Sequence, residues 1–459
     1  MNPNGTLLPL LDRIQGRALL VGGAGVVLGV VGALTHRGDA NDFDRAYLFS
    51  YIFFLGLSLG SLALLMLHRQ LGGAWGFLVR RPLESAAMTL PLMAVLFVPI
   101  LVDLDKIYPW VKHHAETEVP VGGNPQSPLA VKAQDEPTAR SQAGADAAPS
   151  TGPVKVTGGG AGDASGTRGG RRDPLEADNA YLLTFKSHWL DPTWFTIRVA
   201  IYFVIWITLA ATLNIGSRRQ DETGSTKLAY FLQSLSAPGL VLYFLTVSLA
   251  LVDWGMSLEP EWYSSIYGVL LIIGQAVSAM ALMIGVAAVI SRRGETEGLD
   301  RPETFNDLGN LLLAFVMFWA YLSFSQFLII WAGNLSEEIP WYARRLRGTW
   351  TYVGQFLILF HFAVPFLILL SRPAKRNISR LSWVAALVLI AHLVDVYWLI
   401  APSFGEGRPP LRLSWLDLTV PVGMGGLWVW TFLWFLKSKP LMVAHDPELL
   451  PALKQAGGH

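Results

Sequence analysis

Six ionisable residues occur within or at the ends of long apolar stretches of the sequence. Lipid offers no water to solvate a charge, so an ionisable group inside a membrane span costs several kcal/mol unless it is paired or hydrated. Histidine and carboxylate groups are also side chains that readily pass protons on. The sequence therefore offers these candidates for a proton path: His361, His392, Asp395, Asp253, Arg198 and Asp103.

Three of these residues are expected to come together. His392 and Asp395 are spaced i, i+3 and therefore share one face of a helix. His361 lies in the preceding antiparallel stretch at nearly the same predicted depth. Three interpretations fit the group: polar contacts that hold helices together, a proton relay, or a haem held between the two histidines. The haem interpretation predicts a Soret band from the purified chain.

Arg198 is predicted to lie about one turn below the outer membrane surface, where it needs a carboxylate partner. The acids available in the outer half are Asp103, Asp253 and Asp395. A quinol site needs a base or an acceptor for each hydroxyl group, placed in an apolar slot. Asp253 with Tyr202 or Gln326 could supply such a quinol-binding site in the outer half.

The elements that must position these residues are membrane-spanning helices. Of 459 residues, 52% are hydrophobic and 15% are charged, whereas soluble domains carry about 25% charge. Apolar stretches of about 18 residues or more recur along the chain, and each can cross a lipid core roughly 30 Å thick. We predict an all-α integral membrane protein of about ten transmembrane helices, at residues 18–36, 46–67, 85–104, 194–213, 235–253, 263–291, 308–334, 352–370, 381–400 and 416–436.

Composition also excludes several classes of function. Cys is absent, which excludes iron–sulfur clusters, thiolate metal sites and disulfides held by this chain. The net charge is +1 and no basic block is long enough to indicate a nucleic-acid partner. No Gly-rich phosphate loop, GxSxG elbow or HExxH motif is present, so no catalytic residue and no metal ligand is assigned.

Lys and Arg in the short loops predict the orientation. The side that holds the N-terminus has 18 of them, against seven on the other side without the long loop. Both termini are therefore predicted to be cytoplasmic. We expect the first three helices in residues 1–112, a disordered periplasmic loop rich in Gly, Pro and Ala at 113–179, helices four to ten in 180–437, and a cytoplasmic tail at 438–459. The loop is either a docking tether or a neutral insertion.

Two segments mark the outer surface. The turn VDWGMSLEPEWYSSIYG at 252–268 is acidic and aromatic and contains no Lys or Arg. The segment NLSEEIPWYARRLRG at 334–348 predicts a short interfacial helix that begins near Pro340. Its charges either dock an extramembrane subunit or pair among themselves: Glu337, Glu338, Arg344 and Arg345.

Four stretches, at residues 48–76, 252–268, 324–346 and 359–377, resemble a known family. They are similar to ActF-type subunits, the second NrfD-like (polysulfide-reductase-type) membrane subunits of bacterial alternative complex III, a quinol:cytochrome c oxidoreductase. The resemblance implies two four-helix bundles, from the second to fifth and sixth to ninth spans, with flanking helices, in the bacterial inner membrane. It implies no metal or haem in this chain, with quinone or quinol as a candidate ligand. The implied partners are lipid, another NrfD-like subunit, an iron–sulfur subunit and a multihaem cytochrome c.

The expected function is that of a cofactor-free subunit, not catalytic alone, of a quinol:cytochrome c or other quinol-oxidising respiratory complex. It would contribute a proton pathway and subunit docking. One alternative is an NrfD-type quinol-oxidising subunit in its own right. A third is a secondary transporter or a scaffold, but transporters often have Gly- or Pro-broken helices in matched positions of two repeats. Pro91, Pro99 and Pro365 interrupt spans here without forming such a pair.

Overall fold

The computed structural model describes residues 7–35, 41–112, 185–293, 296, 298–405, 411–441, 446, 447, 449 and 451. Every regular element among these residues is a helix. Ten of the helical segments are long and apolar enough to cross a membrane. The predicted fold class and the ten predicted spans are therefore confirmed. The predicted disordered loop at 113–179 and residues 442–445 and 452–459 of the predicted tail lie outside the described residues.

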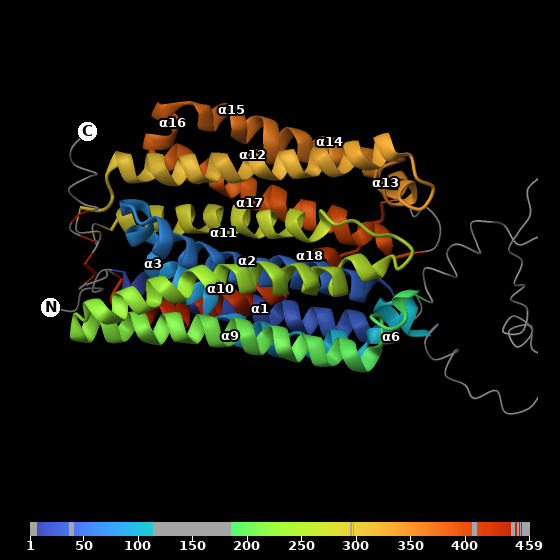
Figure 1. Ribbon diagram of the computed structural model, residues 1–459, viewed down its shortest axis with the longest axis horizontal. Coiled ribbons are helices and arrows are strands. Elements are labelled where there is room, and N and C mark those ends of the chain that lie inside the picture. The colour runs from blue at the N-terminus through green and yellow to red at the C-terminus, as the bar shows by residue number, and fades with distance from the viewer. Residues whose placement is uncertain are drawn as a thin grey trace, which may run out of the picture.

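The ten spans follow one another as antiparallel helices (Figure 1). They are α1 (Leu8–Thr35), α2 (Asn41–Leu71), α3 (Ala74–Ala87) continued by α4 (Leu90–Val95) and α5 (Val98–Val102), α9 (Pro192–Thr223), α10 (Thr226–Trp254), α11 (Tyr267–Ser291), α12 (Pro302–Gly333), α14 (Trp350–Phe356) continued by η3 (Leu357–Ala363) and α15 (Val364–Leu370), α17 (Ile378–Ile400) and α18 (Leu416–Lys437). Short helices α6 (Leu104–Ile107), α13 (Ile339–Arg345) and α16 (Arg372–Arg376) lie at the ends of the bundle.

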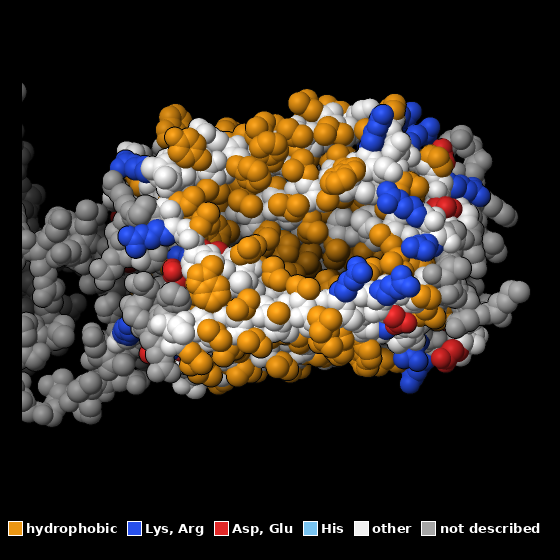
Figure 2. Space-filling view, turned by 180° about the vertical axis from the view of Figure 1, so that it is seen from behind, with side chains coloured by type: hydrophobic (Ala, Val, Ile, Leu, Met, Phe, Trp, Pro, Cys, Tyr) orange, Lys and Arg blue, Asp and Glu red, His pale blue; other side chains and the backbone are white. Residues whose placement is uncertain are grey.

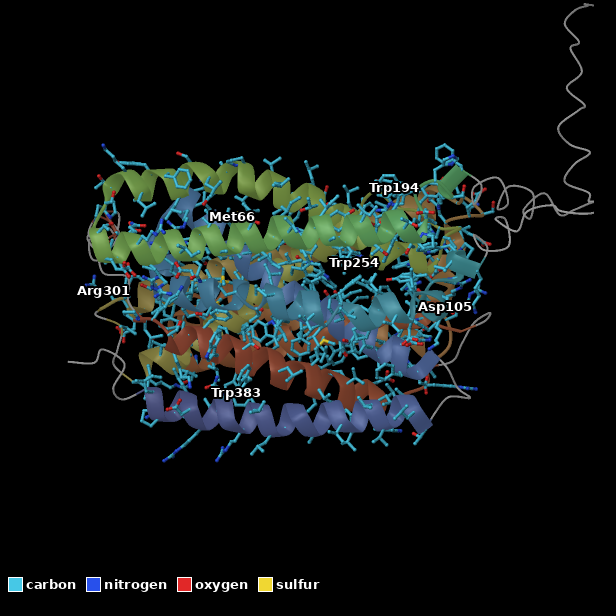
Figure 3. The ribbon with its side chains drawn as sticks, turned by 90° about the horizontal axis from the view of Figure 1, so that it is seen from below. Met66, Asp105, Trp194, Trp254, Arg301 and Trp383 are labelled. Atoms are coloured by element: carbon cyan, nitrogen blue, oxygen red, sulfur yellow. The ribbon has the colours of Figure 1, made fainter. Side chains whose placement is uncertain are left out.

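The molecule has two polar ends and an apolar surface between them. We call the end where α1 begins and α18 ends the N-terminal end, and the end that carries α6 and α13 the distal end (Figure 1). Between them, hydrophobic side chains form a broad belt, while Lys, Arg, Asp and Glu gather toward both ends (Figure 2). Asp105 and Arg301 lie at opposite ends (Figure 3). A belt of this kind is the surface of a multi-pass membrane protein.

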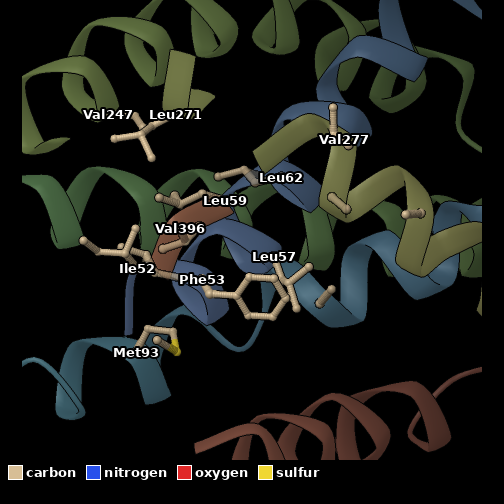
Figure 4. Close-up of a cluster of buried hydrophobic side chains, with 14 of the residues drawn as sticks. Ile52, Phe53, Leu57, Leu59, Leu62, Met93, Val247, Leu271, Val277 and Val396 are labelled. Carbon is tan, nitrogen blue, oxygen red and sulfur yellow. The ribbon is translucent and has the colours of Figure 1, made fainter. Parts of the chain in front are cut away.

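In chain order, the second to fifth spans and the sixth to ninth spans make two sets of four. We call α2, α3 to α5, α9 and α10 the first bundle, and α11, α12, α14 to α15 and α17 the second bundle. α2 packs against α11 in the centre, and 89% of its most apolar stretch is buried, against 22% for α1. Figure 4 shows side chains of α2, such as Ile52, among Val247, Leu271 and Val396 from three other helices. The pair of separate bundles that the resemblance implied stays a prediction, because α2 contacts α11 and α17 as well as α3 and α10.

The third span begins earlier than the sequence predicts and is divided into short helices. α3 begins at Ala74, and Pro91 and Pro99 occupy the first turns of α4 and α5. Proline fits the first turn of a helix because its missing N–H would have no partner there. Because α3 begins at Ala74, Arg80 and Arg81 lie inside a buried helix and not in a loop. Glu84 on the next turn pairs with both arginines, which compensates for their burial.

α1 is attached to the bundle through α18, and glycine allows the two backbones to touch. A Cβ atom at Gly25 would lie 2.6 Å from the Cα atom of Gly423, and one at Gly426 would lie 2.3 Å from the Cα atom of Gly22. Small residues at such spacing let membrane helices approach closely. Gly25 therefore allows the two backbones to approach closely, whereas Gly29 makes only ordinary contact, 3.6 Å from Val420.

Replacing Gly426 by valine should loosen α1 from the bundle, because the new side chain would meet the backbone of α1. We expect Gly426→Val to lower the thermal unfolding temperature of the purified protein in detergent. Gly23→Val is the matched control, since a Cβ atom at Gly23 has no neighbour within 4 Å. An equal loss of stability in the two variants would contradict this packing.

Candidate functional site

The first buried charge pair lies at the distal end of the first bundle. Asp191 caps α9 by accepting a hydrogen bond from the Trp194 N–H (2.8 Å), which fixes the start of the helix. Arg198 follows about two turns later and donates from Nε to Oδ2 of Asp253 (2.9 Å) and from Nη2 to Oδ1 (3.0 Å). Asp253, at the end of α10, is fully buried. Arg198 therefore has the carboxylate partner that the sequence required.

Asp253 has no remaining capacity to accept hydrogen bonds. Besides the two bonds from Arg198, it accepts one from the Trp189 indole (2.8 Å) and one from the Tyr202 hydroxyl (3.1 Å). A carboxylate offers about four lone-pair sites, and four donors occupy them. The group is a closed ion pair, which leaves no acceptor free for a quinol hydroxyl or a transferred proton.

The other residues predicted for this site lie elsewhere. Asp103 pairs with Lys106 at the distal end and does not reach Arg198. Gln326, predicted beside Asp253, lies on α12 in the second bundle, and neither of its amide atoms has a hydrogen-bond partner in the described part of the chain. Of the predicted quinol-binding set, the structure brings together only Asp253 and Tyr202.

A second polar group lies inside the second bundle, where the sequence placed His361, His392 and Asp395. All three are buried, and His392 Nδ1 lies 3.4 Å from Asp395 Oδ2, across the predicted i, i+3 spacing. The ring centres of His361 and His392 are 5.6 Å apart, so the predicted match in depth is confirmed. Trp319 of α12 completes the group, since its indole donates to Asp395 Oδ2 (3.0 Å) and its ring centre lies 4.1 Å from that of His361.

Local sequence explains how these rings come so close. Gly274 on α11 faces His392, and a Cβ atom there would lie 2.4 Å from the His392 Cε1 atom. His361 lies in the π-helical turn η3. Pro365, four residues later, has no N–H to bond the His361 carbonyl. Widened turns of this kind occur frequently at functional sites.

This group is incompletely bonded, in contrast to Asp253. Neither ring nitrogen of His361 has a hydrogen-bond partner among the described residues. Within the described residues, the polar contacts of Asp395 with Trp319 and His392 both involve one carboxylate oxygen, Oδ2. No Lys or Arg forms an ion pair with Asp395 within the described residues. An imidazole and a carboxylate with free positions can accept a proton or a ligand.

A cavity of about 780 Å³ borders the same group. Asp395 and Trp319 contribute to its wall, and the rest is largely apolar, with Phe324, Trp341 and Leu357 among the lining residues. Binding pockets for organic molecules usually measure about 300 to 1,000 Å³ and combine apolar walls with a few polar groups. Asp395 is the one acidic residue in the lining.

The same three residues could also hold a metal ion. One ligand atom from each of His361, His392 and Asp395 can be chosen so that all lie within 4.8 Å of one another. Two imidazoles and a carboxylate are a common donor set for zinc or iron. The Trp319 indole already occupies one Asp395 oxygen, so a metal would bind through the other. The prediction that this chain holds no metal and no haem stays a prediction.

The charged segment at the distal end differs from its predicted arrangement. A helix begins at Ile339 with Pro340 in its first turn, as predicted. Arg344 and Arg345 each donate to Glu259 (3.0 Å) and form no ion pair with Glu337 or Glu338 within the described residues. Arg345 is fully buried and is therefore unavailable to a docking partner, whereas Arg344 and the two glutamates are partly exposed.

The sequence analysis did not single out Glu259. The sequence did contain a sign of this pairing. The turn at 252–268 has acidic residues and no Lys or Arg, and the segment after α12 has two adjacent arginines that could serve as partners. Burial raises the pKa of Glu259, but Arg345, Arg344 and the Ser403 hydroxyl together hold it below its usual value. The carboxylate is therefore charged at neutral pH, and the stability that it contributes is lost as the pH falls through its lowered pKa.

A further charged cluster at the N-terminal end was also missed. Glu84 is fully buried and lies within ion-pair distance of three cations: Arg80 (3.8 Å), Arg81 (2.7 Å) and Lys439 (3.2 Å). The i, i+3 and i, i+4 spacing of the arginines to Glu84 was visible in the sequence. The pairing with Lys439, which follows α18, was not. This cluster joins α3 to the segment that follows the last helix.

Comparisons with known proteins found no family model and no curated protein that matches this chain.

The two acids should differ sharply in their effect on stability. Asp253→Asn leaves the partly buried Arg198 without its counter-charge. Breaking a fully buried pair costs about 3 to 5 kcal/mol, and this change should approach the lower end of that range. Asp395→Asn removes no cation partner, so its cost should stay near about 1 kcal/mol. Chemical denaturation of the purified variants checks this order. If Asp395→Asn proves to be the more destabilised variant, the distinction between a closed and an open group is contradicted.

Proposed function

We propose that this chain is a cofactor-free membrane subunit of a quinol-oxidising respiratory complex, in which it conducts protons and docks sister subunits. The observation that carries this proposal is the open group of His361, His392 and Asp395. Two other buried carboxylates of the bundle, Asp253 and Glu84, are each paired with cations. An unpaired imidazole beside a carboxylate is difficult to explain as structural support alone, because buried polar atoms without partners are costly.

Polar residues extend from this group toward the distal end. Tyr267, at the start of α11, lies within electrostatic range of Asp395, Arg345 and Glu259. Arg345 and Glu259 are buried, and Arg344, which also pairs with Glu259, is partly exposed. A proton could therefore travel between the distal surface and Asp395 through groups that carry exchangeable protons, with water between them.

Polar residues also extend toward the first bundle. His392 packs on Gly274, and the next residue, Gln275, accepts a hydrogen bond from the Tyr243 hydroxyl on α10 (2.7 Å). Hydrated space would have to complete a route from Tyr243 to the Glu84 cluster at the N-terminal end. In this proposal the N-terminal end is cytoplasmic, which the excess of Lys and Arg predicted on that side supports.

Docking is assigned to the distal end. We define the distal ledge as α13 together with the turn at 255–262. The buried bonds from Arg345 to Glu259 (3.0 Å) and from Arg345 to the Ser403 hydroxyl (2.8 Å) hold its parts together. A rigid, partly charged surface suits an extramembrane partner. The partners proposed from the resemblance are an iron–sulfur subunit, a multihaem cytochrome c and another NrfD-like subunit.

Asp395→Asn and His361→Gln test the proton pathway in the intact complex reconstituted in vesicles. Because general acid–base groups speed proton transfer by about 100-fold or more, each variant should strongly reduce proton translocation. Protons moved per electron would be measured with a pH-sensitive dye during quinol oxidation. Asp103→Asn is the control, since Asp103 pairs with Lys106 outside the group. If quinol oxidation fails while the number of protons moved per electron stays normal, the proposed proton pathway is contradicted. If neither quinol oxidation nor proton movement changes, the group has only a structural role.

A specific observation favours a second function, quinol binding. The cavity of about 780 Å³ has apolar walls and one carboxylate, which matches the apolar slot with an acceptor that a quinol needs. We therefore move the candidate quinol site from Asp253, whose oxygens are fully bonded, to Asp395. The hydrogen bond from the Trp319 indole would orient the Asp395 carboxylate toward the bound quinol.

Filling the cavity tests this second function without touching Asp395. Gly354 lines the cavity, and a Cβ atom there makes only ordinary contact, 3.7 Å from Leu346. We expect Gly354→Leu to raise the apparent KM for quinol, because the added side chain occupies cavity space. Gly285→Leu is the control, as a Cβ atom there has no neighbour within 4 Å. Equal kinetics for the two variants would place quinol binding outside this chain.

A further inference from the structure

A small basic pocket lies at the N-terminal end of the first bundle, away from the open histidine group. Its volume is about 50 Å³, and its walls come from the end of α2, from α3 and from the start of α10. The lining includes three basic-type side chains from α2 and α3, together with two residues of α10: His68, Arg69, Arg80, Tyr230 and Gln233. Asp446 also borders the pocket, and its Oδ2 atom accepts hydrogen bonds from Arg80 and Gln220.

Arg69 is the unusual member of this pocket. Its side chain is only 7% exposed, yet Nε and Nη2 have no hydrogen-bond partner within the part of the chain that the structure describes. The neighbouring arginines are paired, Arg80 with Asp446 and Arg81 with Glu84. Among the described residues, the surrounding cluster holds four cations and three carboxylates: Arg69, Arg80, Arg81 and Lys439 against Glu84, Asp221 and Asp446. A buried guanidinium without an acceptor is costly, and within the described residues Nε and Nη2 of Arg69 have none, so the pocket is suited to take up an anion.

Size and position indicate which anion. A guanidinium presents N–H groups in a fork that matches the oxygens of a phosphate group, and a pocket of about 50 Å³ is suited to one small anion. Arg69 lies in the last turn of α2 and Tyr230 in the second turn of α10, so both lie at the polar end of their spans. Tyr230 is 64% exposed, as aromatic residues at the lipid headgroup level tend to be. Basic pockets between helices at this level bind anionic headgroups.

We propose that this pocket binds the phosphate group of an anionic phospholipid, with Arg69 as its main ligand. The site would fix one lipid where α2, α3 and α10 meet. It does not depend on the open group of His361, His392 and Asp395 or on the quinol cavity, which lie in the second bundle. Free inorganic phosphate carries the same chemistry and is the other source to be distinguished.

The test compares Arg69→Gln with wild type and with Arg219→Gln, an exposed arginine on α9. Full-length protein in detergent would be titrated with phosphatidylglycerol, with phosphatidylcholine or with inorganic phosphate. Binding would be followed by native mass spectrometry and by the shift in Tm. We expect one tightly held phosphatidylglycerol per chain in wild type and in Arg219→Gln, and about tenfold weaker binding in Arg69→Gln, because a charge-assisted hydrogen bond is lost.

Each remaining outcome has a defined meaning. In one, inorganic phosphate stabilises wild type but not Arg69→Gln, while phosphatidylglycerol has no effect on either. That result would show that the site binds free phosphate and would overturn the proposal of a bound lipid. Equal lipid binding by all three proteins would overturn the site. If Arg69→Gln does not fold, Arg69→Lys keeps the charge and loses the fork, and its weaker binding would support the proposal while unchanged binding would oppose it.

Discussion

The low polarity of the lipid interior governs this structure, because every charge placed there needs a partner. The bundle satisfies that requirement in three places with buried ion pairs, centred on Asp253, Glu84 and Glu259. Each group joins segments far apart in the sequence, through Arg198 to Asp253, Lys439 to Glu84 and Arg345 to Glu259. The charges therefore also help to fix which helices are neighbours. Buried ion pairs add little net stability, but removing one partner is costly. They therefore act as constraints on the arrangement of the helices more than as a source of stability.

The group of His361, His392 and Asp395 departs from that requirement. It has the residue types of a proton-exchanging site but lacks the saturated bonding of the other clusters. It also borders a cavity of about 780 Å³. The carboxylates Asp253, Glu84 and Glu259 thus belong to ion-paired groups that hold helices together, whereas Asp395 belongs to an open group that borders a cavity. A complete relay would use the open group, with the distal ledge as one end of the path.

The sequence was sufficient for the helices and for part of the site. Long apolar stretches have only one stable form in lipid, so the spans were readable, and i, i+3 spacing placed His392 beside Asp395. Depth alone could not choose among the acids near Arg198, because the choice depends on which helix faces overlap. The same limit applied to Gln326, which has the right height but lies in the other bundle. Trp319 and Glu259 were missed because their roles arise only from contacts between distant segments.

We propose that Asp395 is open to proton exchange while Asp253 is closed. Infrared difference spectroscopy of the intact complex during quinol oxidation would test this most directly, since it detects the carboxyl stretching bands of acids that gain or lose a proton. We predict a carboxyl band that disappears in Asp395→Asn and persists in Asp103→Asn and Asp253→Asn. A band that persists in Asp395→Asn and is lost in Asp253→Asn would contradict it.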